Sequence, residues 1–471
     1  MYSWSLLLTL AILSTALAAP SSSETSSAPA PSPTVPYASD DPNYPLWNLD
    51  SDITPEPIRG GSGATILGPQ NRLLDLQNPD ALAPPTTDNG DVPNFKWPFS
   101  LSHNRLYTGG WARGQNVKDV PCATDIAAVN MRLEAGAIRE MHWHIDAEWA
   151  YMLAGYVRVS TVTPDGKVYL ADVGPGDLWY FPAGFPHNIQ AKNTTEEGAE
   201  FLLIFDSGSF SEDSTFLLID WLAHVPKEVI AKNFQVDTSA FDHIPSRGLF
   251  IFPSDPPPPN AIDDMVVPND TPVNYTFPLS QVNGTKSAGG TYKVVDSTMF
   301  TASTTISAAE ITVEVNGTRE LHWHPTEPEW TYFISGEARI SVYASSSNAR
   351  TSDFQAGDIA YIPPTFGHYV ENTGNTTLKF LEIFKSGLFR DVSLSQWLAL
   401  TPPEHVKAHL QVDDATIAKF SRDKQVVVGP AQPAPTYARS QSLKSQLHTE
   451  TDSLDAYSPH VRNLPRGFGE K

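Results

Sequence analysis

The sequence predicts an all-β protein made of two tandem jelly-roll β-barrel domains, each followed by a short helical segment. Two observations support this fold class. The motif REMHWH at residues 139–144 recurs as RELHWH at 319–324, and GDLWYFPAGFPH from Gly176 recurs as GDIAYIPPTFGH from Gly357, so the chain contains a duplicated domain. Inside each copy, short runs of Val, Ile, Tyr, Phe and Trp alternate with Gly-Asp and Pro-Gly turns, which is typical of closely spaced antiparallel strands.

Composition divides the chain into segments. An apolar stretch ending in small residues predicts a signal peptide over residues 1–18, and a Ser/Pro/Ala-rich composition predicts a flexible leader over 19–45. The first barrel is expected over 95–245 and the second over 276–425, with a proline-rich linker at 246–275. Helical patterning follows each repeat, in TFLLIDWLAHVPKEVIAKNF and LSQWLALTPPEHVKAHL, and a flexible tail is expected over 426–471.

Charge and cysteine content exclude several kinds of partner and site. The 471 residues include 31 Lys and Arg against 53 Asp and Glu, a formal net charge of −22, and such a surface repels nucleic acid and anionic membranes. Cys122 is the only cysteine, which excludes an intramolecular disulfide framework and a zinc site of several thiolates. We expect a secreted, extracellular glycoprotein, with sequons at Asn193, Asn269, Asn274, Asn283, Asn316 and Asn375.

Histidine and glutamate recur in register in the two copies. His142 and His144 are two residues apart in a strand-like segment, so both side chains leave the same face of the sheet. Three imidazoles with one carboxylate suit a first-row divalent ion, with a preference for manganese or iron, and leave positions open for substrate and dioxygen. The predicted ligands of the two metal sites are His142, His144, Glu148 and His187 in the first copy, and His322, His324, Glu329 and His368 in the second.

The paired motifs around these ligands resemble the two cupin motifs of bicupin proteins, and the residues beside them are similar to those of oxalate decarboxylases, as in a secreted, fungal-type member. The resemblance covers roughly residues 95–425. It implies one manganese ion in each barrel, oxalate as the substrate, formate and carbon dioxide as the products, and dioxygen as co-catalyst. The sequence leaves open whether the chain forms a homo-oligomer.

Two arginines are candidates to bind a substrate anion. Arg139 and its counterpart Arg319 could neutralise a carboxylate and stabilise charge that develops in the transition state. Arg139 is one residue out of step with the alternation of His142 and His144, so an exposed strand cation is the alternative. The resemblance implies that Arg139 polarises the substrate in the first barrel.

Two glutamates are candidate proton-transfer groups. Glu212 lies in Ser211-Glu212-Asp213-Ser214, which reads on its own as a helix N-cap with an acidic first turn. The resemblance implies that this segment is the lid of oxalate decarboxylases and that its Glu handles the proton, although Asp213 departs from the Asn of the bacterial lid. Glu382, in an apolar run where the first copy has Leu203, is predicted to face inward as a second-site base near Arg319 or as an ion-pair partner.

Trp143 and Trp323 lie between the paired ligands and are predicted to face the opposite side of the sheet. Core packing is the default role for both, and hole transfer between manganese sites is a further hypothesis. The alternative functions are an oxalate oxidase, a bicupin flavonol dioxygenase, and a non-enzymatic storage or carbohydrate-binding bicupin. Glu212 disfavours the first, and two complete ligand sets disfavour the other two.

Overall fold

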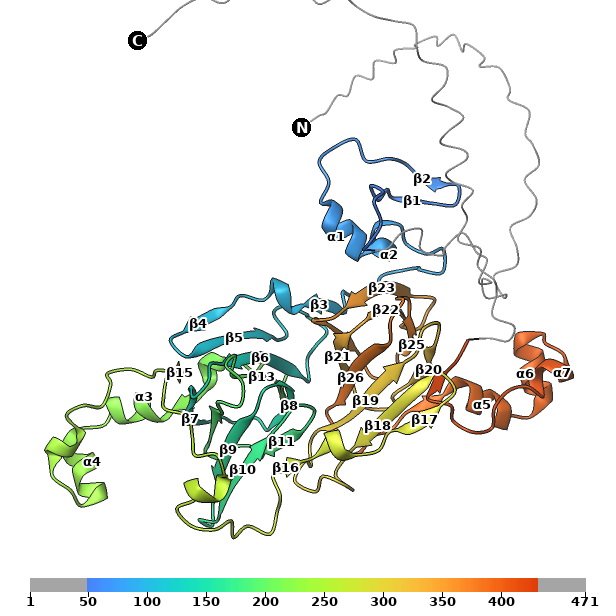
Figure 1. The fold of residues 1–471 in the computed structure, drawn as a ribbon. Helices are drawn as coiled ribbons and strands as arrows, with labels where there is room; N and C mark the ends of the chain where they lie inside the picture. Colours follow the sequence, from blue (N-terminus) through green and yellow to red (C-terminus); the bar gives the residue numbers. More distant parts are fainter. Residues whose placement is uncertain (1–48, 431–471) are drawn as a thin grey trace, which may run out of the picture.

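The computed structural model describes residues 49–430. The predicted signal peptide, the leader and most of the predicted tail lie outside these residues. Two β-barrels lie side by side in Figure 1, the first drawn from cyan to green and the second from yellow to orange. Each barrel is formed by one seven-stranded and one six-stranded antiparallel sheet, which confirms the prediction of two tandem jelly-roll barrels.

The first barrel is built mainly from residues 105–252. Its seven-stranded sheet has the order β16-β11-β8-β13-β6-β5-β4, and its other sheet has the order β10-β9-β12-β7-β14, with β15 also paired to β7. The strands are β4 Arg105–Tyr107, β5 Gly110–Gln115, β6 Ala127–Leu133, β7 Ile138–Trp143, β8 Glu148–Ala154, β9 Val157–Val162, β10 Val168–Val173, β11 Leu178–Phe181, β12 His187–Ala191, β13 Ala199–Phe205, β14 Phe216–Leu217, β15 Ile251–Phe252 and β16 Thr276–Phe277.

The second barrel repeats this arrangement. Its sheets have the orders β17-β18-β19-β26-β21-β24-β3 and β23-β22-β25-β20-β27, with β28 also paired to β20. The strands are β3 Lys96–Pro98, β17 Thr285–Ser287, β18 Gly290–Val295, β19 Ser307–Val313, β20 Thr318–Trp323, β21 Glu329–Ser335, β22 Glu337–Tyr343, β23 Ala349–Gln355, β24 Asp358–Ile362, β25 Gly367–Asn372, β26 Leu378–Phe384, β27 Val392–Ser393 and β28 Val427–Val428.

The barrels exchange short strands at their edges. β3 precedes the first barrel in the chain but pairs with β24 of the second, and β16 follows the first barrel and pairs with its strand β11. The strand pairing therefore departs from the predicted domain boundaries at residues 95 and 276. It also departs inside the predicted linker and at the start of the predicted tail, where β15 and β28 pair with β7 and β20. Backbone pairing of an edge strand carries little signal in composition, which explains these differences.

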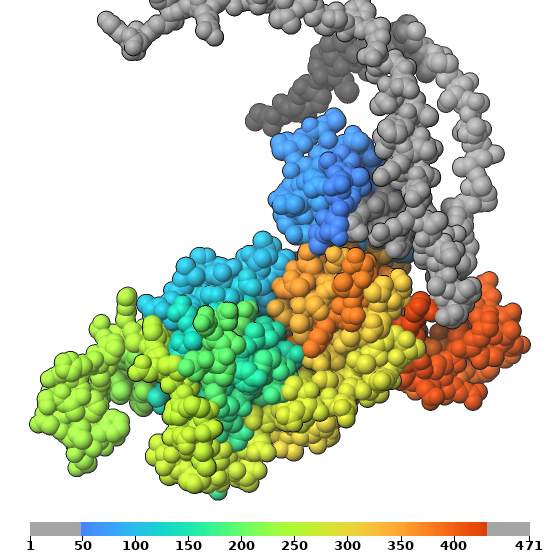
Figure 2. Space-filling view, in the orientation of Figure 1, coloured from blue at the N-terminus to red at the C-terminus, as the bar shows by residue number. Residues whose placement is uncertain are grey.

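Helices extend from the far end of each barrel. Figure 2 shows the two helical extensions at opposite ends of the molecule, green after the first barrel and red after the second. Within residues 49–430, no helix is long and apolar enough to cross a membrane. The helices after the barrels are α3 Leu218–Ala223, α4 Lys227–Phe234, α5 Leu394–Leu400, α6 Pro403–Leu410 and α7 Asp414–Ile417.

Apolar side chains form a core inside each barrel and a third core between the barrels. Alternation along a strand divides them, because Trp149 on β8 belongs to the core between the barrels while Ala150 points into the first barrel. Trp330 on β21 occupies the equivalent position in the second barrel and donates its indole N–H to Gln115 of the first. The large apolar contact between the barrels holds the two candidate sites in one rigid unit.

The segment before the first barrel packs against the second barrel through buried charges. It contains β1 Ile58–Arg59, β2 Ser62–Gly63, α1 Arg72–Gln77 and α2 Pro79–Leu82, and the two helices contact β23. The Asp80 carboxylate pairs with Arg59 and Arg339, each at 2.7 Å, and the Asp80 backbone N–H donates to Asp353 at 2.9 Å. Burial, and next the adjacent Asp80, raises the pKa of Asp353 well above its usual range.

The raised pKa of Asp353 predicts that the free energy of unfolding depends on pH. Because the pKa of Asp353 is raised in the folded protein, its contribution is complete below the usual pKa of about 3.9 and is lost as the pH rises through the folded value. Between those limits the loss is about 1.4 kcal/mol per pH unit. We expect Asp353→Asn to remove this component, so the difference in unfolding free energy between variant and wild type should change with pH. A denaturant series from acidic to neutral pH measures it, and a constant difference would contradict the prediction.

Candidate metal centres and active site

Four predicted ligands converge inside the first barrel. His142 lies on β7, His144 directly follows it, Glu148 begins β8, and His187 begins β12 opposite His142. The same arrangement occurs in the second barrel, where His322 on β20 pairs with His368 on β25. All eight side chains are buried, and within each set the ligand atoms lie within 4.8 Å of one another: His142, His144, Glu148 and His187, and His322, His324, Glu329 and His368.

Backbone carbonyls orient the imidazoles toward the centre of each set. The Nδ1 atoms of His142, His144 and His187 hydrogen-bond to backbone carbonyls at 2.6, 2.7 and 2.8 Å, which leaves each Nε2 facing the other ligands. His187 Nε2 is buried and has no hydrogen-bond partner, and the same is true of His322 Nε2 in the second set. An unpartnered buried nitrogen in a set of three imidazoles and one carboxylate fits a divalent metal ion.

The carboxylate of the first set, Glu148, accepts a hydrogen bond from a residue on the neighbouring strand. Glu148 accepts from the indole N–H of Trp179 at 2.9 Å through one oxygen, while the other oxygen lies 3.3 Å from His144 Nε2. Burial, and next the charge of Arg139, lowers the pKa of His142 well below its usual value. His142 is therefore neutral, as a metal ligand must be.

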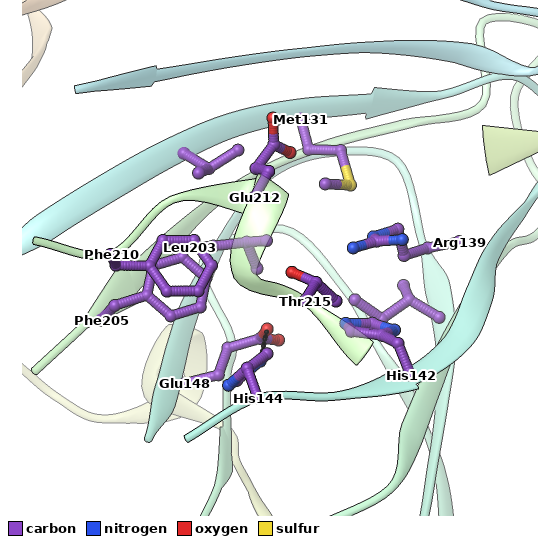
Figure 3. Close-up of a pocket in the computed structure, with 12 residues that line it drawn as sticks. Met131, Arg139, His142, His144, Glu148, Leu203, Phe205, Phe210, Glu212 and Thr215 are labelled. Atoms are coloured by element: carbon purple, nitrogen blue, oxygen red, sulfur yellow. Dashed lines mark hydrogen bonds and ion pairs between the residues drawn. The ribbon is translucent and has the colours of Figure 1, made fainter. Parts of the chain in front are cut away.

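A β-bulge places Arg139 on the same side of the sheet as the ligands. Arg139 pairs with Ile189 and His142 pairs with His187, so two residues on β7, Glu140 and Met141, oppose the single residue Asn188 on β12. The extra residue shifts the alternation of side chains along β7, so Arg139 is buried on the side of the ligands. The alternative of an exposed strand cation is therefore wrong. Arg139 is buried and lines a cavity together with His142, His144 and Glu148 (Figure 3).

The segment with Glu212 covers the same cavity. Residues Glu212–Ser214 form a short 3-10 helix, η2, that is capped by Ser211. Glu212 is only 8% exposed, and its Oε1 atom has no hydrogen-bond partner. The hydroxyl of Thr215 is likewise buried and unpartnered, and both residues line the cavity beside Arg139 (Figure 3). Burial raises the pKa of Glu212, although Arg139 and Arg105 oppose this shift.

Arg105 on β4 anchors this segment to the barrel. Its guanidinium donates to both carboxylate oxygens of Asp213, at 2.7 and 3.0 Å, and its Nε lies 3.7 Å from Glu212 Oε2. Asp213, the departure from the bacterial lid, thus has a bidentate partner. The contact lies at the surface, since Asp213 is largely exposed, so breaking this ion pair costs little free energy.

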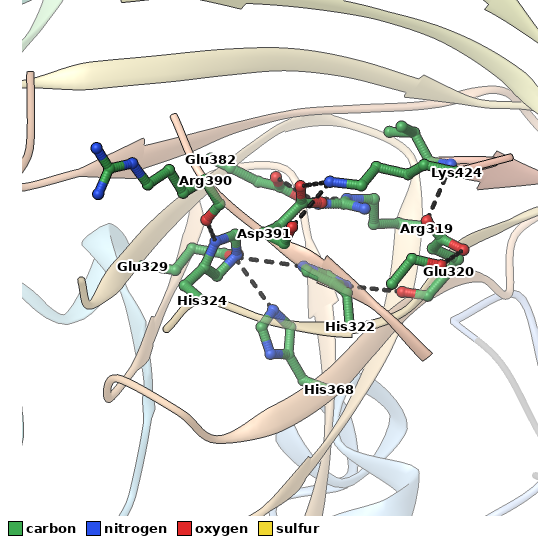
Figure 4. Close-up of polar contacts among 12 residues, drawn as sticks. Arg319, Glu320, His322, His324, Glu329, His368, Glu382, Arg390, Asp391 and Lys424 are labelled. Carbon is green, nitrogen blue, oxygen red and sulfur yellow. Dashed lines mark hydrogen bonds and ion pairs between the residues drawn. The ribbon is translucent and has the colours of Figure 1, made fainter. Parts of the chain in front are cut away.

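The second site pairs its arginine with carboxylates. Arg319 Nε lies 3.0 Å from Glu382, and Arg319 Nη2 lies 2.7 Å from Asp391, which also contacts Lys424 (Figure 4). The carboxylate charges of Glu382 and Asp391 raise the pKa of Arg319 against the effect of burial. Burial raises the pKa of Glu382 to about 7, although Arg319 opposes this shift. Glu382 faces inward as predicted, and its partner is the arginine.

In the second barrel, the segment around Arg390 corresponds to η2, and a hydrogen bond to a ligand histidine fixes it. The Arg390 carbonyl accepts from His324 Nδ1 at 2.8 Å, whereas the equivalent His144 bonds to a carbonyl two residues along its own chain. Among residues 49–430, salt bridges join Arg319 to two carboxylates, but none joins Arg139 to any. The two sites therefore share their ligand sets and differ in the charge available to an incoming anion.

Trp143 and Trp323 lie outside the three apolar cores. Trp143 stacks on Phe216 with ring centroids 5.6 Å apart and meets Trp221 of α3 edge-on, while Trp323 meets Trp397 of α5 edge-on. They are on the face opposite the ligands, as predicted, but they pack beneath the helical extensions. The reason is that α3 and α5, the first helices after each barrel, place Trp221 and Trp397 against these side chains.

Sequence reasoning missed several residues that build the first site. Glu140 accepts from the backbone N–H groups of Ile219, Leu249 and Phe250, which fixes the chain around the cavity. Its repetition as Glu320 within the duplicated motif was an available signal. Phe250 and Asp391 contact the two arginines from distant parts of the chain, and no local pattern marks either of them.

Comparison with known proteins agrees with this geometry. The family model described as Cupin matches residues 101–241 and 278–418. The chain is 51% identical over 375 residues to oxalate decarboxylase OxdC from Bacillus subtilis, covering 79% of this chain and 97% of that protein. It is 41% identical over 407 residues to an oxalate decarboxylase from Arthroderma benhamiae, covering 79% and 93%. A solved structure of the Bacillus subtilis enzyme, studied for its Mn(II) centres, matches with a TM-score of 0.78 and 51% identity over 80% of this chain and all of that one.

Proposed function

The chain belongs to the bicupin oxalate decarboxylase family, and from this premise we propose that it is a manganese-dependent enzyme that converts oxalate to formate and carbon dioxide. The singly protonated anion suffices for this reaction: the carbon–carbon bond breaks, one half leaves as carbon dioxide, and the other half gains a proton on carbon. Family membership supports manganese as the ion at both ligand sets and dioxygen as the co-catalyst. A bound manganese ion would supply a Lewis acid and a redox centre.

One observation carries the assignment of the reaction to the first barrel. Only there, among the residues described, do a complete ligand set, an arginine without a carboxylate partner and an unpartnered buried carboxyl oxygen line one cavity. The second barrel has the ligands, but Glu382 and Asp391 already neutralise its arginine. A small dianion or monoanion therefore meets a cation without a carboxylate partner at the first site and a neutralised cation at the second.

Arg139 and Glu212 divide the work of the reaction. Arg139 binds a carboxylate of oxalate and stabilises its charge while the carbon–carbon bond breaks. Glu212 delivers the proton to the carbon that becomes formate, and its burial keeps the acid form available. Closure of η2 over the cavity excludes water at that moment.

The direct test incubates purified, manganese-loaded protein with oxalate at acidic pH. Formate, carbon dioxide and hydrogen peroxide are measured together. Equal amounts of formate and carbon dioxide with little peroxide support the decarboxylase. Two molecules of carbon dioxide with one of peroxide would identify an oxalate oxidase, and no consumption of oxalate by fully loaded protein would exclude both enzymes.

Metal content gives an independent prediction. We expect two manganese ions per chain, and Glu148→Ala and Glu329→Ala should each reduce the content to about one, because each removes the anionic ligand of one set. Formate production should disappear in Glu148→Ala and survive in part in Glu329→Ala. Elemental analysis and the formate assay on the same samples measure both. Equal loss of activity in the two variants would contradict assignment of the chemistry to the first barrel.

We also propose that the protein is a secreted, fungal-type glycoprotein. The apolar residues 5–18 support export, and all six sequon asparagines are exposed. Asn269 is the weakest acceptor of the six, since its side chain forms two hydrogen bonds with the backbone of Leu170. Mass spectrometry of the protein from its own culture medium tests export and glycan occupancy together.

A further inference from the structure

An aromatic pair covers the guanidinium of Arg139. The centre of this guanidinium lies 3.8 Å from the centroid of the Phe250 ring, and its Nη1 donates to the Phe250 carbonyl at 3.2 Å. The Tyr107 ring stacks on the Phe250 ring, with centroids 4.9 Å apart and planes inclined by 9°. Phe250 therefore contacts both Tyr107 and Arg139, and Arg139 lines the cavity.

The backbone holds Phe250 in a conformation that a bulky residue rarely adopts. Its φ is +65°, in the left-handed region. The Glu140 carboxylate accepts from the N–H groups of Leu249 and Phe250, and the Glu140 N–H donates to the Phe250 carbonyl at 2.9 Å. The next residue, Ile251, pairs with Arg139 in the sheet. Two segments far apart in sequence are thus fixed in register, with the ring laid over the arginine.

The second barrel has the same backbone arrangement without the aromatic rings. Val426 has a φ of +57°, its N–H donates to Glu320, and its carbonyl accepts from the Glu320 N–H at 2.9 Å. Ser287 stands where the first copy has Tyr107, and it bonds to backbone carbonyls. Arg319 there is balanced by Glu382 and Asp391. The duplicated barrels therefore stabilise the same buried cation in two different ways.

The difference matters for binding an anion. A carboxylate stabilises a guanidinium by occupying its in-plane N–H donors and cancelling its charge. An aromatic face stabilises the cation from above the plane, so the charge and the remaining in-plane donors stay available. We propose that Phe250, supported by Tyr107, is a positioning residue that orients Arg139 and keeps it free to bind the substrate carboxylate. This inference rests on the proposed function for the identity of the substrate.

The stack also brings the arginine near the lid. Tyr107 and Arg105 lie on the same strand, β4, and Arg105 contacts both Glu212 and Asp213. Burial, and next the charge of Glu212, raises the pKa of Tyr107, so its ring is neutral while it supports Phe250. One short strand thus supports both the arginine and the segment that carries the candidate acid.

The test compares Phe250→Leu, Phe250→Tyr and the matched control Val426→Leu in manganese-loaded protein. Leucine keeps an apolar side chain and the backbone carbonyl but removes the aromatic face. We expect Phe250→Leu to raise KM for oxalate about tenfold, with a smaller change in kcat. Phe250→Tyr should restore KM to within about twofold of wild type, and Val426→Leu should leave it unchanged. A purely structural role for Phe250 would alter the unfolding midpoint without this split between KM and kcat.

Formate binding, measured by calorimetry, provides a readout that needs no turnover. Phe250→Leu should weaken formate binding about tenfold while the metal content stays at the wild-type level. If Phe250→Leu binds formate as tightly as wild type and keeps its KM for oxalate, the inference is overturned. If wild type fails to convert oxalate but formate binding still depends on Phe250, the proposed function fails and the positioning role stands.

Discussion

Replacement of Glu212 by glutamine is expected to reduce formate production at least about 100-fold while oxalate is still consumed with release of peroxide. Glutamine retains the volume of the side chain but cannot supply a carboxyl proton. The cavity that Glu212 lines still contains the metal ligands and Arg139, so oxalate can bind and its carbon–carbon bond can break. Without a proton for the carbon, the remaining half is oxidised to a second carbon dioxide, and dioxygen takes up the electrons as peroxide.

The assay measures formate, carbon dioxide and peroxide per oxalate consumed, in wild type, Glu212→Gln and Glu212→Ala. The matched control is Asp213→Asn, the exposed neighbour on the same turn, which keeps an acceptor for Arg105 and should still yield mainly formate. Formate yield per oxalate that is unchanged in both Glu212 variants would discard Glu212 as the proton donor. Formate production lost equally in Asp213→Asn would assign the effect to movement of the lid instead of the proton.

The pH dependence of formate production should follow the same carboxyl. Burial raises the pKa of Glu212, so its acid form persists to higher pH than that of an exposed glutamate. Formate production is therefore expected to fall as the pH rises through this raised value.

The formal charge of −22 does not prevent an anionic substrate from binding, because salt screens the surface carboxylates over about 10 Å while Arg139 acts inside the cavity.

The metal ligands could be predicted from the sequence because each depends on local geometry. His142 and His144 share a face by strand alternation, and the recurrence of the set in a second copy makes coincidence improbable. The position of Arg139 could not be predicted in the same way, since it depends on a bulge that appears only when β7 is paired with β12. A one-residue irregularity in register carries no compositional signal, yet it decides which face a side chain occupies.

The different environments of the two arginines could not be predicted from the sequence either. Arg139 and Arg319 stand at equivalent positions of one motif, and their immediate neighbours are nearly the same. The residues that distinguish them come from elsewhere in the chain. Phe250 lies over Arg139, whereas Glu382 and Asp391 form ion pairs with Arg319. The sequence did mark Glu382 as unusual, because Leu203 replaces it in the first copy, but only the tertiary structure resolves it into an ion pair.

These environments predict opposite consequences for the same substitution at the two arginines. Arg319→Met leaves Glu382 and Asp391 buried without their common cation, and removal of one partner from a buried ion pair costs about 3–5 kcal/mol of unfolding free energy. Arg139→Met removes a buried cation that has no carboxylate partner, so stability should change by about 1 kcal/mol or less. Loss of the same arginine from the first cavity should lower kcat/KM for oxalate by about 100-fold to 1,000-fold.

Denaturant unfolding and oxalate kinetics on both manganese-loaded variants measure this crossover. A second change tests its cause: Arg319→Met combined with Glu382→Leu imitates the apolar Leu203 of the first copy and leaves Lys424 as the partner of Asp391. Because a buried ion pair can be replaced by apolar side chains at little cost, the double variant should regain most of the stability that Arg319→Met loses. Equal destabilisation by the two single variants, or no recovery in the double variant, would show that Arg319 does not act by neutralising Glu382.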